Sequence, residues 1–167
     1  VALDLDALAA GVEHGFVQRE RAIDRDIVIA ARELAVAGIG FHEGCRAFGE
    51  NYVQEALAKI DALTDLRPSL EWHLIGPLQS NKTREVAEAF DWVHTIDRLK
   101  IAERLSAQRP EHLPPLQVCV QVNVSGEASK SGVEPVQLTA LAQAVSTLPR
   151  LRLRGLMSIP EPVEGLE

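Results

Sequence analysis

Residues 70–99 read LEWHLIGPLQSNKTREVAEAFDWVHTIDRL, and this stretch decides the fold class. Its first part, Leu70–Gly76, alternates apolar and other residues and stops at a Gly-Pro pair, as a short buried strand does. Polar residues follow, and Ser80 or Asn81 is placed to cap a helix that begins near Lys82. A strand whose carboxyl end opens into a polar loop before a helix is one unit of a parallel α/β protein. In such proteins ligands bind at that end of the sheet.

The same alternation of strand and helix continues on both sides of this stretch. Further strands are predicted at 46–48, 92–96, 116–124 and 151–159, and helices at 27–38, 53–60, 97–108 and 135–148. About five strands separated by helices call for a parallel sheet. The pattern alone leaves a closed (β/α)8 barrel and an open doubly wound sheet as alternatives. The glycine-rich fingerprints GxGxxG and GxxxxGK[ST] are absent from the sequence, which excludes nucleotide cradles of those two kinds.

Apolar periodicity also predicts where individual side chains lie. Ile27–Gly38 is predicted to be a helix because its apolar residues share a face, with the glycine at its end. Lys59 is expected on the exposed side of its helix, and Leu99 is expected to turn inward. The strand at 116–124 alternates cleanly between two faces. In a barrel its polar residues would point into the interior: Gln117, Cys119, Gln121 and Asn123.

Length and composition indicate one globular domain. The chain has 167 residues, 46% of them apolar and 25% charged, and is short for a closed eight-fold barrel, which takes about 250. It holds no apolar run near the roughly 18 residues of a membrane span, and its N-terminus as it stands is not expected to be a secretion signal. The net charge of −7 argues against nucleic acid as a partner. Cys45 and Cys119 lack CxxC spacing and fit reduced thiols in a cytoplasmic protein, and no set of histidines and carboxylates has metal-ligand spacing.

Several polar residues fall at predicted strand ends, and each has two interpretations. His73 and His94 are more simply core histidines than ligand contacts. Asn51 is either part of a turn or a contact to a bound ring. Lys82 and Lys130 are either solvated cations or groups that bind phosphate or form an imine. Together, polar groups at strand ends favour a small anionic or polar ligand.

Five motifs in order and spacing resemble the pyridoxal phosphate homeostasis protein family: GENYVQE (49–55), WHLIGPLQSNK (72–82), HTIDRL (94–99), SKSG (129–132) and RLRGLMSIP (152–160). The resemblance covers residues 44–162, whereas residues 1–43 match poorly. It implies a single, incomplete domain over 1–167, a parallel (β/α)8 TIM-like barrel of the alanine racemase N-terminal type. It also implies pyridoxal 5′-phosphate (PLP) as the cofactor, held at the carboxyl ends of the strands.

The resemblance further implies a role. Members of this family are carriers or buffers in intracellular PLP homeostasis without a defined turnover, so the chain is expected to be a cytoplasmic protein and not an enzyme. Its expected partners are PLP and client enzymes that depend on PLP, with no nucleic acid and no membrane. One alternative is a degenerate scaffold of the same fold that binds no PLP. The other is an amino-acid racemase, which would need a PLP lysine and an opposed tyrosine base, and the only tyrosine is Tyr52.

Position by position, the resemblance implies a set of cofactor contacts. Asn51 would lie near the pyridine ring and His73 beneath or beside it, while Met157 and Ser158 would line the wall. Lys130 matches a family lysine at the mouth and would be a secondary contact. Residues 79–82 would shape the rim. No metal ligand is implied.

Two departures from the family pattern bear on function. The family carries its Schiff-base lysine on the first strand, about twenty residues before GENY, whereas no lysine precedes Lys59 here. That first strand is also expected to be missing, and the last two strands, with their phosphate-binding loops, would follow Glu167. The sequence therefore predicts no catalytic lysine, weak or no covalent PLP binding, and Lys130 as the surrogate. Missing segments, a natural remnant and a partner-completed fold are the explanations; we favour the first, because a partial barrel leaves open edges.

Overall fold

A parallel sheet forms the centre of the protein. The computed structural model describes residues 27–29, 46–125 and 131–159. Six strands follow one another in the sheet in chain order, and every neighbouring pair is parallel. They are β1 (Ile27–Ile29), β2 (Ala47–Glu50), β3 (Glu71–Leu74), β4 (Trp92–Ile96), β5 (Leu116–Gln121) and β6 (Leu151–Met157). This sequential parallel order is that of a β/α barrel and confirms the predicted fold class.

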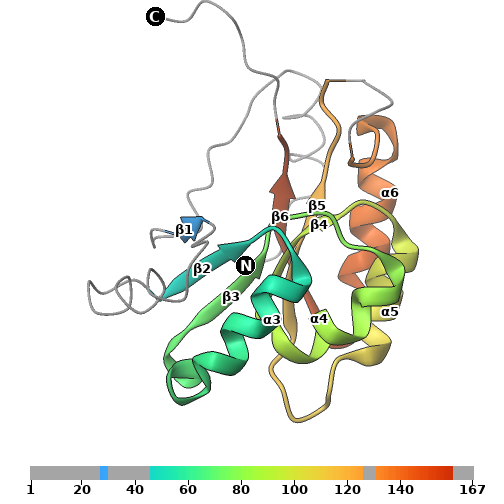
Figure 1. Ribbon diagram of the computed structural model, residues 1–167. Helices are drawn as coiled ribbons and strands as arrows, with labels where there is room; N and C mark the ends of the chain where they lie inside the picture. The colour runs from blue at the N-terminus through green and yellow to red at the C-terminus, as the bar shows by residue number, and fades with distance from the viewer. Residues whose placement is uncertain (1–26, 30–45, 126–130, 160–167) are drawn as a thin grey trace, which may run out of the picture.

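Helices connect the strands and cover one face of the sheet (Figure 1). They are α3 (Val53–Ala62), α4 (Thr83–Ala89), α5 (Leu99–Gln108) and α6 (Pro135–Ser146), with short 3₁₀ turns η1 (Thr64–Ser69) and η2 (Ser80–Lys82). We call the face covered by these helices the outer face and the opposite one the inner face. Because side chains alternate along a strand, each strand contributes to both.

The hydrophobic core lies between the outer face and the helices. Phe48 and Trp72 are paired in register on neighbouring strands, and their ring centroids lie 5.6 Å apart. Helix residues such as Val86, Leu105 and Val145 are completely buried in the same core. Burial of large apolar side chains is worth roughly 1.5–3 kcal/mol each, so this layer dominates the stability of the fold.

The first strand corrects an expectation. Ile27–Ile29 is a strand that pairs in parallel with Ala47–Gly49, not the start of a helix. Three consecutive β-branched residues suit a sheet, and pairing with β2 gives this strand backbone hydrogen bonds along one edge. The helical spacing came from residues further along the segment, which lie outside the described residues. A strand therefore precedes β2, and the expectation that this strand is missing is wrong.

Two side chains also differ from expectation. Lys59 is buried, with 6% of its surface exposed, because its ammonium meets the buried carboxylate of Glu50. Leu99, at the first position of α5, is 38% exposed and does not turn inward. The predicted caps at Ser80 and Asn81 are likewise wrong. No side chain caps α4, and the Thr83 hydroxyl instead donates to the Ser80 carbonyl at 2.9 Å.

The outermost described strands differ from the inner ones in their pairing. In the part of the chain that the structure describes, β1 pairs only with β2 and β6 only with β5. Residues of β6 are half-buried or exposed along the whole strand, whereas β5 is almost entirely buried. The described helices contain no segment that is long and apolar enough to cross a membrane.

Candidate functional site

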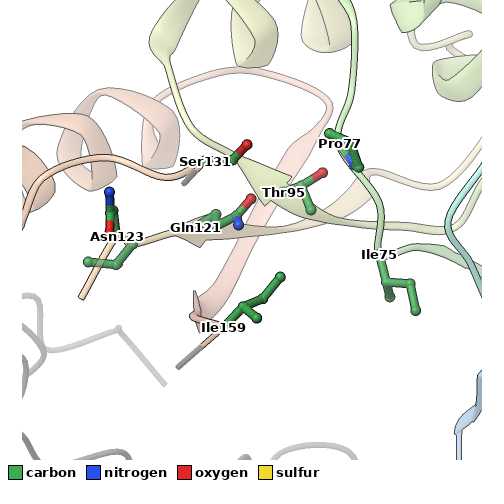
Figure 2. A pocket seen from close by; sticks show the side chains of 8 residues that line it. Ile75, Pro77, Thr95, Gln121, Asn123, Ser131 and Ile159 are labelled. Carbon is green, nitrogen blue, oxygen red and sulfur yellow. The ribbon is translucent and has the colours of Figure 1, made fainter. Parts of the chain in front are cut away.

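A hollow of about 220 Å³ lies at the carboxyl ends of β3, β4 and β5 (Figure 2). It combines apolar walls with a few polar groups, as small-molecule sites do. Its lining residues are Ile75, Pro77, Thr95, Gln121, Val122, Asn123, Ser131 and Ile159. Its place at the strand ends is the one that parallel α/β proteins use for ligands.

The wall formed by β3 and β4 depends on Gly76. The register between β4 and β5 shifts between Val93 and Ile96, and the Thr95 hydroxyl donates to the Gly76 carbonyl at 2.8 Å. A Cβ atom on Gly76 would lie 2.0 Å from the backbone oxygen of Asn51. Only glycine therefore allows the chain after β3 to approach the end of β2 this closely.

The wall formed by β5 is fixed by backbone hydrogen bonds between Val133 and the end of this strand. Val133 N–H donates to the Gln121 carbonyl at 2.8 Å, and Asn123 N–H donates to the Val133 carbonyl at 2.9 Å. Gly132, directly before Val133 in sequence, has φ +127°, and a Cβ there would lie 2.6 Å from the Asn123 nitrogen. This conformation favours glycine. This arrangement brings Ser131 to the rim of the hollow.

Two histidines from neighbouring strands meet on the inner face. His73 Nδ1 lies 2.9 Å from His94 Nε2, and both side chains are buried. The indole ring of Trp92 stacks on His73 with centroids 5.2 Å apart. Burial, and to a smaller extent the charge on His94, lowers the pKa of His73 from 6.5 to about 3. Burial lowers the pKa of His94 to about 4. Both imidazoles are therefore neutral at neutral pH.

The surroundings of this pair select a tautomer. His73 Nε2 is buried without a hydrogen-bond partner, and Glu71 Oε2 lies 3.8 Å from it. A nearby carboxylate favours a proton on that nitrogen. His94 Nε2–H then donates to His73 Nδ1, since a neutral ring carries one proton. Both nitrogens of His73 thereby face protein groups, which fits the core-histidine interpretation.

The predicted contact residues that the structure describes come from three different strands. Asn51 follows β2 with an exposed side chain, His73 is buried beside His94, and Met157 and Ser158 are half-buried at the end of β6. None of these four is a lining residue of the hollow, but Met157 pairs in register with Gln121. Lys130 lies outside the described residues and directly precedes Ser131 in sequence. These assignments stay predictions.

Sequence reasoning missed part of the lining. Gln121 and Asn123 were placed in the interior by alternation but not among the contact residues, and Thr95 was not singled out. The register shift beside it has no local sequence signal. Lys82 at the expected rim is paired with Glu85, Nζ to Oε1 3.0 Å, and does not line the hollow.

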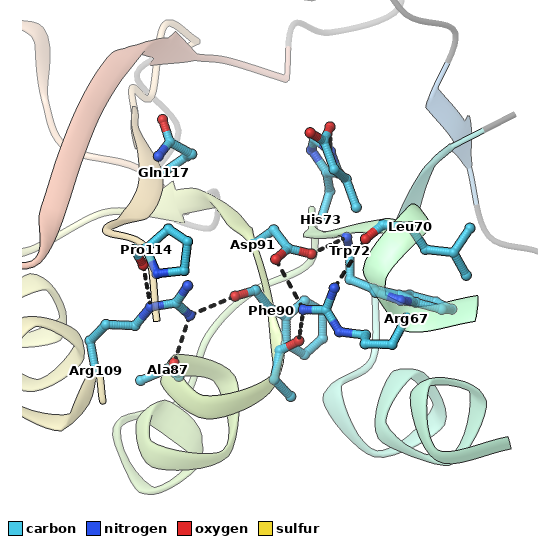
Figure 3. A network of polar contacts seen from close by, with 12 residues as sticks. Arg67, Leu70, Trp72, His73, Ala87, Phe90, Asp91, Arg109, Pro114 and Gln117 are labelled. Carbon is cyan, nitrogen blue, oxygen red and sulfur yellow. Dashed lines mark hydrogen bonds and ion pairs between the residues drawn. The ribbon is translucent and has the colours of Figure 1, made fainter. Parts of the chain in front are cut away.

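The opposite end of the sheet is organised by two arginines (Figure 3). Arg67 donates to the Ala89 carbonyl at 2.9 Å and pairs with Asp91 at 3.0 Å. Arg109 is buried, which lowers its pKa. Its guanidinium donates to three carbonyls, those of Ala87, Phe90 and Pro114, at 2.8, 2.8 and 2.9 Å. These contacts fix the end of α4 and the connector before β5.

A family model and several curated proteins match this chain. Residues 31–165 match the family model described as alanine racemase, N-terminal domain. A pyridoxal phosphate homeostasis protein of Pseudomonas aeruginosa is 65% identical over 133 residues, which are 80% of this chain and 54% of that protein. Its namesake in Escherichia coli K12 is 63% identical over 120 residues, 71% of this chain and 51% of that protein. The chain thus spans about half the length of these curated relatives.

Solved structures show the same fold. PipY of Synechococcus elongatus PCC7942 without PLP is 37% identical with a TM-score of 0.77, covering 96% of this chain and 73% of that one. PipY with PLP bound is 35% identical with a TM-score of 0.72, covering 95% and 72%. An alanine racemase of Clostridium difficile 630 is 15% identical with a TM-score of 0.59, covering 92% and 39%, which shows the fold alone.

Proposed function

This chain belongs to the alanine racemase N-terminal domain family, and we propose that it binds PLP reversibly and serves PLP homeostasis as a carrier without turnover of a substrate. The observation that carries the proposal is the hollow at the carboxyl ends of β3, β4 and β5. PipY, a solved structure of similar fold, has been obtained with PLP bound. Relatives of more than 60% identity bear the name pyridoxal phosphate homeostasis protein.

The residues of the hollow suit non-covalent binding of a small polar ring. Thr95, Gln121 and Asn123 supply hydroxyl and carboxamide groups, while Ile75 and Ile159 supply apolar contacts. When bound, PLP supplies an aldehyde that amines attack and a pyridine ring that withdraws electrons. This chain's part is to hold the molecule and shield it from water. Transfer to PLP-dependent client enzymes belongs to the same proposal.

An imine needs an amine beside the hollow, and the described lysines do not provide one. Lys59 is buried against Glu50 on the outer face, and Lys82 is paired with Glu85. Lys100 is exposed on α5. None of the three lines the hollow. Lys130, beside Ser131 in sequence, remains the predicted surrogate.

The test is a PLP titration of the full chain by equilibrium dialysis, followed by borohydride reduction and intact-mass measurement. We expect saturable binding that dialysis reverses, and any reduced adduct to be lost in Lys130→Met but kept in the control Lys100→Met. Saturating PLP at 100 times its dissociation constant should raise the free energy of unfolding by about 2.7 kcal/mol. No binding and no thermal shift would favour the non-binding scaffold.

A further inference from the structure

Gln121 is a buried polar residue on the hollow, and its side chain has no hydrogen bond to any of the described residues. Only 5% of the residue is exposed. Its main-chain oxygen accepts from Val133, but none of the described residues pairs with its carboxamide. Figure 2 shows this carboxamide at the end of β5, pointing toward Thr95 and away from Asn123. It lines the hollow directly.

The other polar groups near it have partners within the protein. The Thr95 hydroxyl donates to the Gly76 carbonyl. Asn123 accepts from the Ser125 hydroxyl at 3.0 Å through Oδ1. Gln121 therefore has the most unused hydrogen-bonding capacity at the end of β5.

The polar atoms of this carboxamide are not among the described buried atoms that lack a partner, so they are accessible from the hollow. A carboxamide with no partner among the described residues is available to a polar group of a ligand that enters the hollow. We propose that Gln121 is a specificity-determining residue, whose carboxamide hydrogen-bonds a polar substituent on the ring of the bound ligand. The inference rests on the proposed function, in which that ligand is PLP.

The chemistry of the group narrows what it recognises. A carboxamide is neutral and offers one acceptor oxygen and two N–H donors. It therefore suits a ring hydroxyl or ring nitrogen, whereas phosphate recognition relies on cations and clustered backbone N–H groups. Gln121 should accordingly act on pyridoxal, which lacks the phosphate, as strongly as on PLP.

The experiment compares two methionine variants of the full chain. Gln121→Met removes the carboxamide at nearly constant volume. Gln117→Met is the matched control, because Gln117 lies on the same strand and face but at the opposite end of the sheet, where its Nε2 donates to the Pro115 carbonyl. Dissociation constants for PLP, pyridoxal and inorganic phosphate are measured by equilibrium dialysis, and the midpoint of thermal unfolding is measured without ligand.

We expect Gln121→Met to weaken PLP and pyridoxal about tenfold each, as loss of one hydrogen bond does. It should leave phosphate binding unchanged and should not lower the thermal midpoint. Gln117→Met should change PLP affinity less than about twofold. If Gln121→Met fails to fold, Gln121→Leu, which also lacks the carboxamide, takes its place, with the same expected loss for pyridoxal.

The outcomes separate the two proposals. Unchanged PLP affinity in Gln121→Met would overturn the role of Gln121 and leave the proposed function standing. A loss for PLP without a loss for pyridoxal would place Gln121 at the phosphate and overturn the ring assignment. No PLP binding by the unaltered chain would overturn the proposed function, and the inference with it.

Discussion

Lys59 and Glu50 form a buried ion pair between α3 and the end of β2, with Nζ 2.7 and 2.9 Å from the two carboxylate oxygens. Their side chains are 7% and 3% exposed. The pair lies on the outer face, directly before the Asn51 turn that the resemblance places beside the cofactor. This ion pair therefore attaches α3, the helix after the turn, to the end of β2.

Removing one partner of this pair should be strongly destabilising. Lys59→Met leaves the Glu50 carboxylate buried without a countercharge, and we expect a loss of about 3–5 kcal/mol in urea unfolding. The double variant Glu50→Gln/Lys59→Met should recover much of that loss. Lys100→Met, on the exposed side of α5, is the control and should cost little. A small effect of Lys59→Met would mean that water reaches the carboxylate.

The neutral histidine pair predicts a pH dependence of stability. Burial lowers the pKa of His73 and of His94, to about 3 and about 4, below the ordinary 6.5. Between about pH 4 and 6.5 the unfolded chain binds more protons than the folded one, so stability falls as the pH drops through this window. Above pH 6.5 this contribution is complete.

The measurement is urea unfolding at pH 7.5 and at pH 5.0. His94→Gln should reduce the difference in unfolding free energy between the two conditions, because one buried titrating ring is removed. His112→Gln, at an exposed position before β5, should leave the difference unchanged. If the unaltered protein and both variants showed the same pH dependence of stability, that dependence would come from other groups.

Gly76 predicts a steric effect at the hollow. In Gly76→Ala the new methyl group meets the Asn51 backbone oxygen at 2.0 Å, so the chain must shift. We expect a loss of about 3 kcal/mol in stability and weaker PLP binding. Gly155→Ala is the matched control, because a Cβ there meets nothing within 4 Å. Equal stability of the two variants in thermal unfolding would contradict this account.

Arg109 predicts a stability effect at the other end of the sheet. Arg109→Met leaves the carbonyls of Ala87, Phe90 and Pro114 without their donor, and we expect a loss of about 2–4 kcal/mol in urea unfolding. Arg109→Lys should retain only part of the stability that the arginine provides, because an ammonium group lacks the planar fork of the guanidinium. Arg84→Met, an exposed position on α4, should cost less than about 0.5 kcal/mol.

Most of the fold could be predicted because its signals are local. The alternation in Leu116–Gln121 and the helical spacing in Pro135–Ser146 each report one buried face, and both elements are confirmed. Ile27–Ile29 was assigned wrongly because its pairing partner, β2, lies about twenty residues away. Local periodicity does not record such a pairing.

The site was less predictable for the same reason. Lys59 lies on a helix face shared with Val53 and Ala56, yet its burial depends on Glu50 across the connection. Thr95 lines the hollow beside a register shift that no local residue type predicts. Gln121 was placed correctly on the inner face, because alternation along a strand is sufficient for that. That none of the described residues bonds its carboxamide is visible only once the neighbouring strands are in place.

The two ends of the sheet have different roles. The arginine network secures the connections at one end, while the hollow and its polar groups occupy the other. Substitutions that adapt ligand preference at one end can therefore accumulate without loosening the contacts that hold the scaffold at the other. A chain built in this way is evolvable: its recognition chemistry can diverge while its architecture is inherited unchanged.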